Sequence, residues 1–211
     1  MLDEYLQFAR SQLGSIASLA NVNFDSGSGS IDRFSMASAT IFSRDFASKF
    51  FTDDVVVANI MAVKKYDQET NSLVYDESKF NSVDIKWVSS KPTLAEFHKE
   101  LIKILDFEQD KRFDVIYLSF DHISPEFSYD MVNLILKTLD DSIRSRDLKK
   151  SNEALNYLNE QYRNTQNTAL KNSLNFLIES RLETQMLANI GDFYYFDVID
   201  KAYVPFYKKA P

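Results

Sequence analysis

The feature that most restricts the fold of this 211-residue chain is a long span without a helix breaker. After Pro125, neither Gly nor Pro occurs again before Gly191. Ser124 can cap a helix, and Pro125 suits its first position because a helix leaves that backbone N–H unpaired. Apolar spacing predicts a helix continuing to about Asn164, roughly 60 Å long at 1.5 Å per residue. That length exceeds the diameter of a compact domain of this size, so we expect the helix to project from one.

A second helix is predicted to fold back along the first. The polar stretch "RNTQNTALKN" marks the reversal, Thr168 would begin the returning helix, and Gly191 would end it. The apolar stripe on each limb is narrow, which favours an antiparallel helical hairpin. Because two helices alone cannot fully bury such stripes, we expect contacts with other copies of the chain. The candidate residues for arm packing or oligomer contacts are Leu148, Leu155, Leu158, Tyr162, Leu170, Leu174 and Leu177.

The remaining segments predict short helices and strands. Ser43, Asp53 or Asp54, and Thr93 can each cap a helix, and Glu96 completes a capping box with Thr93. The sequence "LDFEQDKRFDVIYLSF" predicts two strands joined by a turn, and "VDIKWV" and "YYFDVID" alternate as half-buried strands do. Near the start, Leu2–Ala20 has helical spacing, and a Gly/Ser loop follows at Gly27 and Gly29.

These elements together predict an α+β fold class. We expect a small mixed β-sheet base packed with helices, formed by residues 1–123 and 189–211. A long projecting helical hairpin arm, residues 124–188, would be inserted between the two parts of the base.

The composition excludes several classes of function. The net charge of −7 and pI near 4.9 give a surface that repels a phosphate backbone, so nucleic acid is not an expected partner. The absence of Cys excludes disulfides, thiolate zinc sites and Cys nucleophiles. The longest apolar run, "VVVANIMAV", is shorter than the roughly 18 residues that cross a bilayer.

No residue pattern in the chain predicts catalysis. Asp121 and His122 are adjacent, and neighbouring strand residues point to opposite faces, so they are badly placed to act as a pair. His98 lies beside the apolar face of a predicted helix. Phosphate-binding glycine motifs and nucleophile elbows are absent, and we predict no cofactor, no metal and no enzymatic activity. The carboxylates that occur in pairs are typical of caps or solvated helix faces: Asp53–Asp54, Asp140–Asp141 and Glu179/Glu183. The aromatic residues near the C-terminus are more typical of a core or an interface than of sugar-stacking platforms: Phe193, Tyr194, Tyr195, Phe196 and Tyr203.

The order of segments resembles the bacterial polysaccharide chain-length determinants, also called class 1 polysaccharide co-polymerases. The likeness spans nearly the whole chain. The segments that carry it are "LGSIASLANVNF", "SRDFASKFF", "IMAVKKYDQETNSLVYD", "KPTLAEFHKELIKIL", "SPEFSYDMVNLILKTLDDSIRSRD" and, most diagnostic, "ETQMLANIGDFYYFDVIDKAYVP".

The resemblance implies a periplasmic domain of a bacterial inner-membrane protein, flanked by two transmembrane helices that this chain does not contain. We expect it to be an excised domain that has lost its first strand, with the second membrane helix coming after "FDVIDKAYVP". It would assemble side by side into rings and set the chain length of O-antigen lipopolysaccharide or a related surface polysaccharide. Its partners would be itself, the glycan polymerase in the inner membrane and the growing glycan.

Two alternatives stay open. One is the periplasmic domain of a capsule or exopolysaccharide co-polymerase linked to a tyrosine kinase, which would differ in the segment after Pro211. The other is a glycan-processing enzyme that uses paired carboxylates, which would need two such groups about 5–10 Å apart in a sugar-sized cleft.

Overall fold

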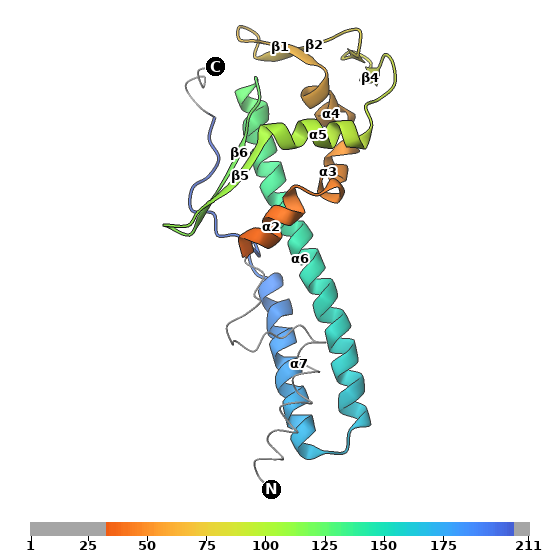
Figure 1. Cartoon of the computed structure of the whole chain (residues 1–211), viewed down its shortest axis with the longest axis vertical. Coiled ribbons are helices and arrows are strands. Elements are labelled where there is room, and N and C mark those ends of the chain that lie inside the picture. Colours follow the sequence, from red (N-terminus) through yellow and green to blue (C-terminus); the bar gives the residue numbers. More distant parts are fainter. Residues whose placement is uncertain (1–32, 205–211) are drawn as a thin grey trace. The chain divides into compact units, whose positions relative to one another are not determined.

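The computed structural model describes residues 33–204, as two compact units (Figure 1). The hairpin unit comprises residues 140–197, and the α+β unit comprises residues 33–139 and 198–204. One boundary between the two units falls after Leu139, within the long helix that begins at Pro125. The other falls after Asp197, beyond the end of the helix that folds back along it. The predicted helix at Leu2–Ala20, the loop at Gly27 and Gly29 and the Lys208–Lys209 tail lie outside the described residues.

The α+β unit contains four short helices, and three of them begin where their capping residues predict. The four are α2 (Arg33–Ile41), α3 (Arg44–Phe51), α4 (Asp54–Met61) and α5 (Leu94–Ile104). The Ser43 hydroxyl caps α3 by accepting from the Phe46 N–H at 3.1 Å, and the Asp53 carboxylate caps α4. Thr93 and Glu96 form the predicted capping box at the start of α5. Each cap stabilises its helix by about 1 kcal/mol.

The strands form three separate antiparallel pairs. They are β1 (Val63–Asp67) with β2 (Ser72–Tyr75), β3 (Phe80–Asn81) with β4 (Lys86–Trp87), and β5 (Leu105–Asp110) with β6 (Val115–Phe120). Among the described residues no strands pair in parallel, so three hairpins take the place of the expected mixed sheet. The β5–β6 pair agrees with the predicted strands, and the overall class is the predicted α+β fold with a long helical arm.

The β1–β2 hairpin lies in the polar stretch "VKKYDQETNSLVY". The Asp67 carboxylate accepts from the Glu69 N–H at 2.9 Å, and Asn71 takes a positive φ of 49°. Short polar side chains tolerate that conformation, so this polar stretch closes a tight turn between two strands.

Two predicted strands are wrong. Of "VDIKWV", only Lys86 and Trp87 belong to a strand, because the Asn81 side chain accepts from the Val83 and Asp84 N–H groups and folds that stretch into a turn. The stretch "YYFDVID" contains no strand. The Tyr194 and Tyr195 N–H groups donate to the Asp140 carboxylate instead of to a strand ladder.

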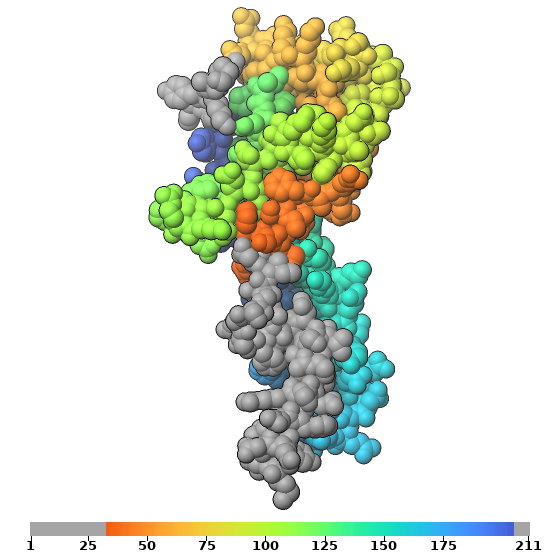
Figure 2. Space-filling view, viewed as in Figure 1, coloured from red at the N-terminus to blue at the C-terminus, as the bar shows by residue number. Residues whose placement is uncertain are grey.

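The core of the α+β unit is aromatic and aliphatic. The Phe46, Phe97 and Leu101 side chains are fully buried where α3 and α5 pack together. A second cluster holds the β hairpins against α4: Phe80 packs with Ala58 and Ala62, and Tyr75 and Trp87 cover them. Figure 2 shows β1–β4, in yellow tones, forming one continuous surface.

Helix α6 (Pro125–Asn164) has 40 residues and begins and ends where the sequence predicts. Its first turn is capped by the Ser124 hydroxyl, which accepts from the Phe127 N–H at 3.2 Å. Helix α7 (Thr168–Ala188) is capped by Asn167 and runs antiparallel to the part of α6 in the hairpin unit (Figure 1). Gly191 follows the end of α7 with a φ of +84°, as a residue past a helix end commonly does.

Candidate self-association face

The seam of the hairpin unit is a small apolar core. Leu158 of α6 and Leu174 and Leu177 of α7 are buried together. Tyr162, Leu170 and Ile178 pack against them, and the Lys171 ammonium lies 5.2 Å from the Tyr162 ring centroid. The apolar side chains of the seam therefore pack against one another within a single chain.

Polar contacts continue the seam along the two helices. The Ser151 hydroxyl donates to the Arg181 carbonyl at 3.0 Å. The Gln185 amide donates to the Asn152 side chain at 2.6 Å. Because these partners are about 30 positions apart in sequence, each bond fixes the register of α7 against α6.

All seven residues predicted for arm packing or oligomer contacts lie in the hairpin unit. The buried ones are Leu155, Leu158, Leu174 and Leu177, and the half-buried ones are Leu148, Tyr162 and Leu170. Five of them belong to the seam, so the structure assigns those five to packing within the hairpin. A surface for another copy must come from other side chains.

The other side of α7 carries exposed apolar side chains. The side chains of Phe176, Leu182, Met186 and Leu187 are 59%, 45%, 66% and 57% exposed. At about 100° per residue, these four positions span an arc of about 140° whose centre is opposite the midpoint between Leu174 and Leu177. We call them the α7 outer face. Sequence reasoning missed it because it sought one apolar side per helix, and α7 has apolar residues on two.

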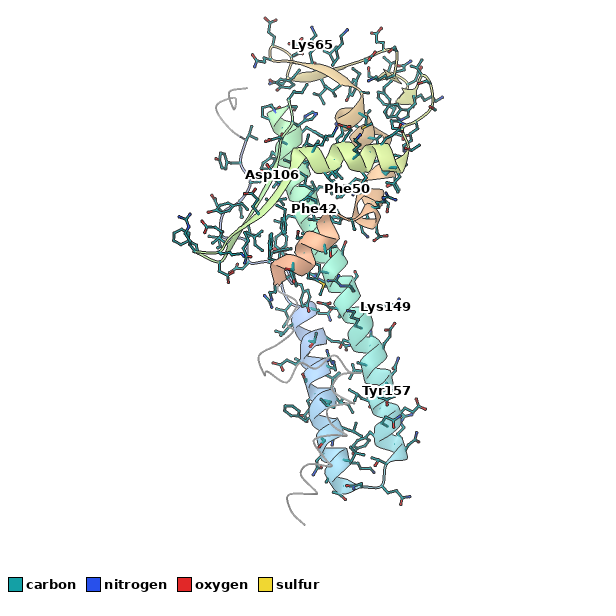
Figure 3. The ribbon with its side chains drawn as sticks, viewed as in Figure 1. Phe42, Phe50, Lys65, Asp106, Lys149 and Tyr157 are labelled. Atoms are coloured by element: carbon teal, nitrogen blue, oxygen red, sulfur yellow. The ribbon has the colours of Figure 1, made fainter. Side chains whose placement is uncertain are left out.

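The α7 outer face is interrupted by carboxylates. Glu179 and Glu183 are exposed and fall in the same arc of the helix. On α6, Lys149 and Tyr157 are also exposed (Figure 3). An apolar patch broken by charge is typical of a surface that associates reversibly.

A buried carboxylate fixes the segment that follows α7. The Asp140 side chain is 1% exposed and accepts from the backbone N–H groups of Tyr194 at 3.0 Å and Tyr195 at 2.7 Å. Arg144 pairs with Asp140 at 3.1 Å and donates to the Asp192 carbonyl at 3.0 Å. The negative charge is thus compensated by three groups, and the chain after α7 is held against α6.

The two histidines are engaged with the backbone. The Nε2 atom of His98 lies 2.9 Å from the Phe42 carbonyl. His122 accepts at Nδ1 from the Ser124 N–H, at 3.1 Å, so Nε2 carries the proton and donates to the Asn59 carbonyl at 2.9 Å. Burial lowers the pKa of His122 because it penalises the imidazolium. Both ring nitrogens of His122 have partners, which leaves neither for a reacting proton.

Several of the other candidate groups also have structural partners. Asp53 caps α4, and Asp54 pairs with Lys91 at 2.6 Å. Tyr194 donates to Asp147 at 3.3 Å, and the Tyr195 and Phe196 rings meet edge to face at 5.1 Å. Among residues 33–204, no three His, Asp or Glu side chains gather as a metal site would require.

A hollow of about 500 Å³ lies along α6. Its lining side chains are polar or charged: Asn156, Asn159, Glu160, Arg163 and Asn164. Organic cofactors usually occupy pockets lined mainly by apolar side chains, so this lining does not resemble a cofactor site.

No protein-family model matches the chain, and no curated protein or solved structure matches it either. Of the helices within residues 33–204, none has both the length and the apolar character to cross a membrane.

Proposed function

We propose that this protein is a non-catalytic scaffold that regulates the chain length of O-antigen lipopolysaccharide or a related surface polysaccharide. In this proposal it is the periplasmic domain of a bacterial inner-membrane protein, and it forms a ring-like homo-oligomer that acts with the glycan polymerase. The growing glycan is a further partner.

The observation that carries the proposal is the α7 outer face. Four large apolar side chains are exposed on one side of a helix whose opposite side is already packed. Burying such side chains between copies is favourable by roughly 25 cal/mol per Å² of apolar surface. Helical hairpins that present an apolar side are well suited to lateral contact with further hairpins.

The net charge of the chain limits how strongly its copies can associate. At −7 per copy, neighbouring copies repel one another at long range. Assembly therefore depends on the apolar contact and on whatever raises the local concentration, such as a shared membrane. The link to glycan length rests on the resemblance of the ordered segments to the chain-length determinants.

Light scattering over a range of protein concentrations tests the assembly. We expect the parent to increase in mean mass with concentration and the double variant Leu182→Asp/Met186→Asp to remain monomeric. Leu134→Asp is the matched control, because Leu134 is 43% exposed and Leu182 is 45% exposed, but Leu134 lies on α6 in the α+β unit. Equal association of parent and double variant would overturn the role of the α7 outer face.

A cellular experiment tests the biological role. The full-length natural protein is expressed in a bacterium that makes O-antigen but lacks its own chain-length determinant, and the lipopolysaccharide is separated by gel electrophoresis. We expect a random ladder to become a modal distribution, and the double variant to lose that effect. A ladder unchanged by the parent protein would reject the proposed function.

A further inference from the structure

Three exposed aliphatic side chains lie at and just after the β3–β4 hairpin. Val83 is 90% exposed, Ile85 is 52% exposed and Val88 is 59% exposed. We call them the aliphatic tip. They belong to the stretch "VDIKWV", which was predicted to form a half-buried strand, and the structure instead presents these three side chains to solvent. Apolar side chains gathered on a turn in this way indicate a contact surface.

The hairpin that carries the aliphatic tip is well ordered. The Asn81 side chain accepts from the Val83 N–H at 2.9 Å and donates to the Asp84 carboxylate at 3.0 Å. The Val88 N–H donates to the Lys79 carbonyl at 2.9 Å. Beneath the turn, the Trp87 ring packs edge to face on buried Phe80, 5.2 Å between centroids. The exposure is thus a property of a fixed turn.

Ile85 adopts a backbone conformation that disfavours its own side chain. Its φ is +53°, in the left-handed region, where a β-branched residue is unusual and its backbone is strained. The other non-glycine residues with positive φ in the described chain are Asn71 and Asp114, both of types that tolerate it. An Ile at this position therefore contributes something other than backbone stability.

The size and charge of the aliphatic tip favour a bilayer over a protein partner. Three side chains expose at most a few hundred Å², below the roughly 800 Å² per partner of a stable protein interface. Insertion among lipids needs no complementary shape and scales with the apolar area that enters. Lys79 and Lys86 flank the turn and are offset by Glu77 and Asp84, so the attraction comes from the aliphatic side chains. The Lys86 stem is long enough to place its ammonium at the headgroups.

We propose that the aliphatic tip inserts into the interface of a lipid bilayer, with Trp87 next to the headgroup level. This goes beyond the scaffold function and does not depend on the α7 outer face. It is a peripheral contact made by a folded turn.

Quenching of Trp87 by lipids with brominated acyl chains tests the insertion, because Trp87 is the single Trp of the chain. We expect phosphatidylcholine vesicles to quench the parent as lipid is added. Ile85→Asn removes the aliphatic group and suits the left-handed φ, so we expect it to fold at least as stably. Its partition coefficient onto vesicles should fall about tenfold or more.

Phe113→Asn is the matched control, since Phe113 is 70% exposed in the turn that joins β5 and β6. It should leave the quenching unchanged. Absence of quenching in the parent, or equal quenching in Ile85→Asn, would overturn the proposal. The parent could instead associate with itself in the absence of lipid, and Ile85→Asn could abolish that association. This result would also overturn the proposal, and it would assign the aliphatic tip to contact with a second copy of the chain. A monomeric Leu182→Asp/Met186→Asp variant should be quenched like the parent, which separates this test from that of the scaffold.

Discussion

At the residue scale, His122 links two elements of the α+β unit. Its ring joins the Asn59 carbonyl of α4 to the Ser124 N–H that precedes α6, and it packs edge to face on Phe127 with centroids 4.7 Å apart. A proton on Nδ1 would face the Ser124 N–H, placing two donors against each other. The neutral ring is therefore the form that fits the fold.

The stability of the α+β unit should depend on pH through His122. Because burial lowers the pKa of His122 in the folded state, its contribution is fully present above the unfolded pKa of about 6.5. It is lost as pH falls through about 6.5 toward the lower folded pKa, because the unfolded chain then binds the proton preferentially. Urea unfolding followed by Trp87 fluorescence should show a free energy of unfolding that falls with decreasing pH across this window.

The control is His122→Gln, which should weaken that part of the pH dependence. Glu126 does not confound the measurement, because hydrogen bonds, first from its own backbone N–H, hold its pKa below the ordinary value. An equal slope in parent and variant over the same window would contradict the assignment to His122.

At the element scale, α7 packs one side and exposes the other, and the two sides predict different responses to substitution. Leu174→Ala removes a side chain that is 1% exposed in the seam and should lower the free energy of unfolding by about 2–4 kcal/mol. Phe176→Ala, from a position 59% exposed, should change it by about 0.5 kcal/mol or less. Thermal unfolding followed by circular dichroism measures both, and equal effects would contradict the assignment of the two sides.

The helices and strands also show which structural features can be predicted from the sequence. The caps at Ser43, Asp53 and Thr93 were predictable because each depends on residues within three positions. The irregular course of "YYFDVID" was not, because it depends on Asp140, which lies 54 positions before Tyr194. Likewise, alternation in "VDIKWV" fits a strand, and only the Asn81 side chain shows that the backbone turns there. The α7 outer face was missed because exposure depends on which side of the helix the seam occupies.

At the scale of the whole molecule, each of the two units has buried clusters of its own. Leu158, Leu174 and Leu177 are in the hairpin unit, whereas Phe46, Phe97 and Leu101 are in the α+β unit. Trp87 packs against a cluster of the α+β unit and reports on it. We therefore expect unfolding to depart from a single two-state transition.

Two probes test this expectation. With Leu174→Ala, the urea midpoint seen by helical circular dichroism should decrease, while the midpoint seen by Trp87 fluorescence should stay within error of the parent. A matching decrease in both midpoints would show that the units unfold together.

The path of the chain between the units has a consequence for biosynthesis. The chain leaves the α+β unit after Leu139, forms residues 140–197 of the hairpin unit, and returns at Val198. On a ribosome, the segment 198–204 therefore emerges after the complete hairpin. The hairpin can close its seam as soon as α7 is released, before residues 198–204 of the α+β unit have been translated. Among the described residues, the unit whose translation begins first is thus the unit whose last segment is translated after the other's.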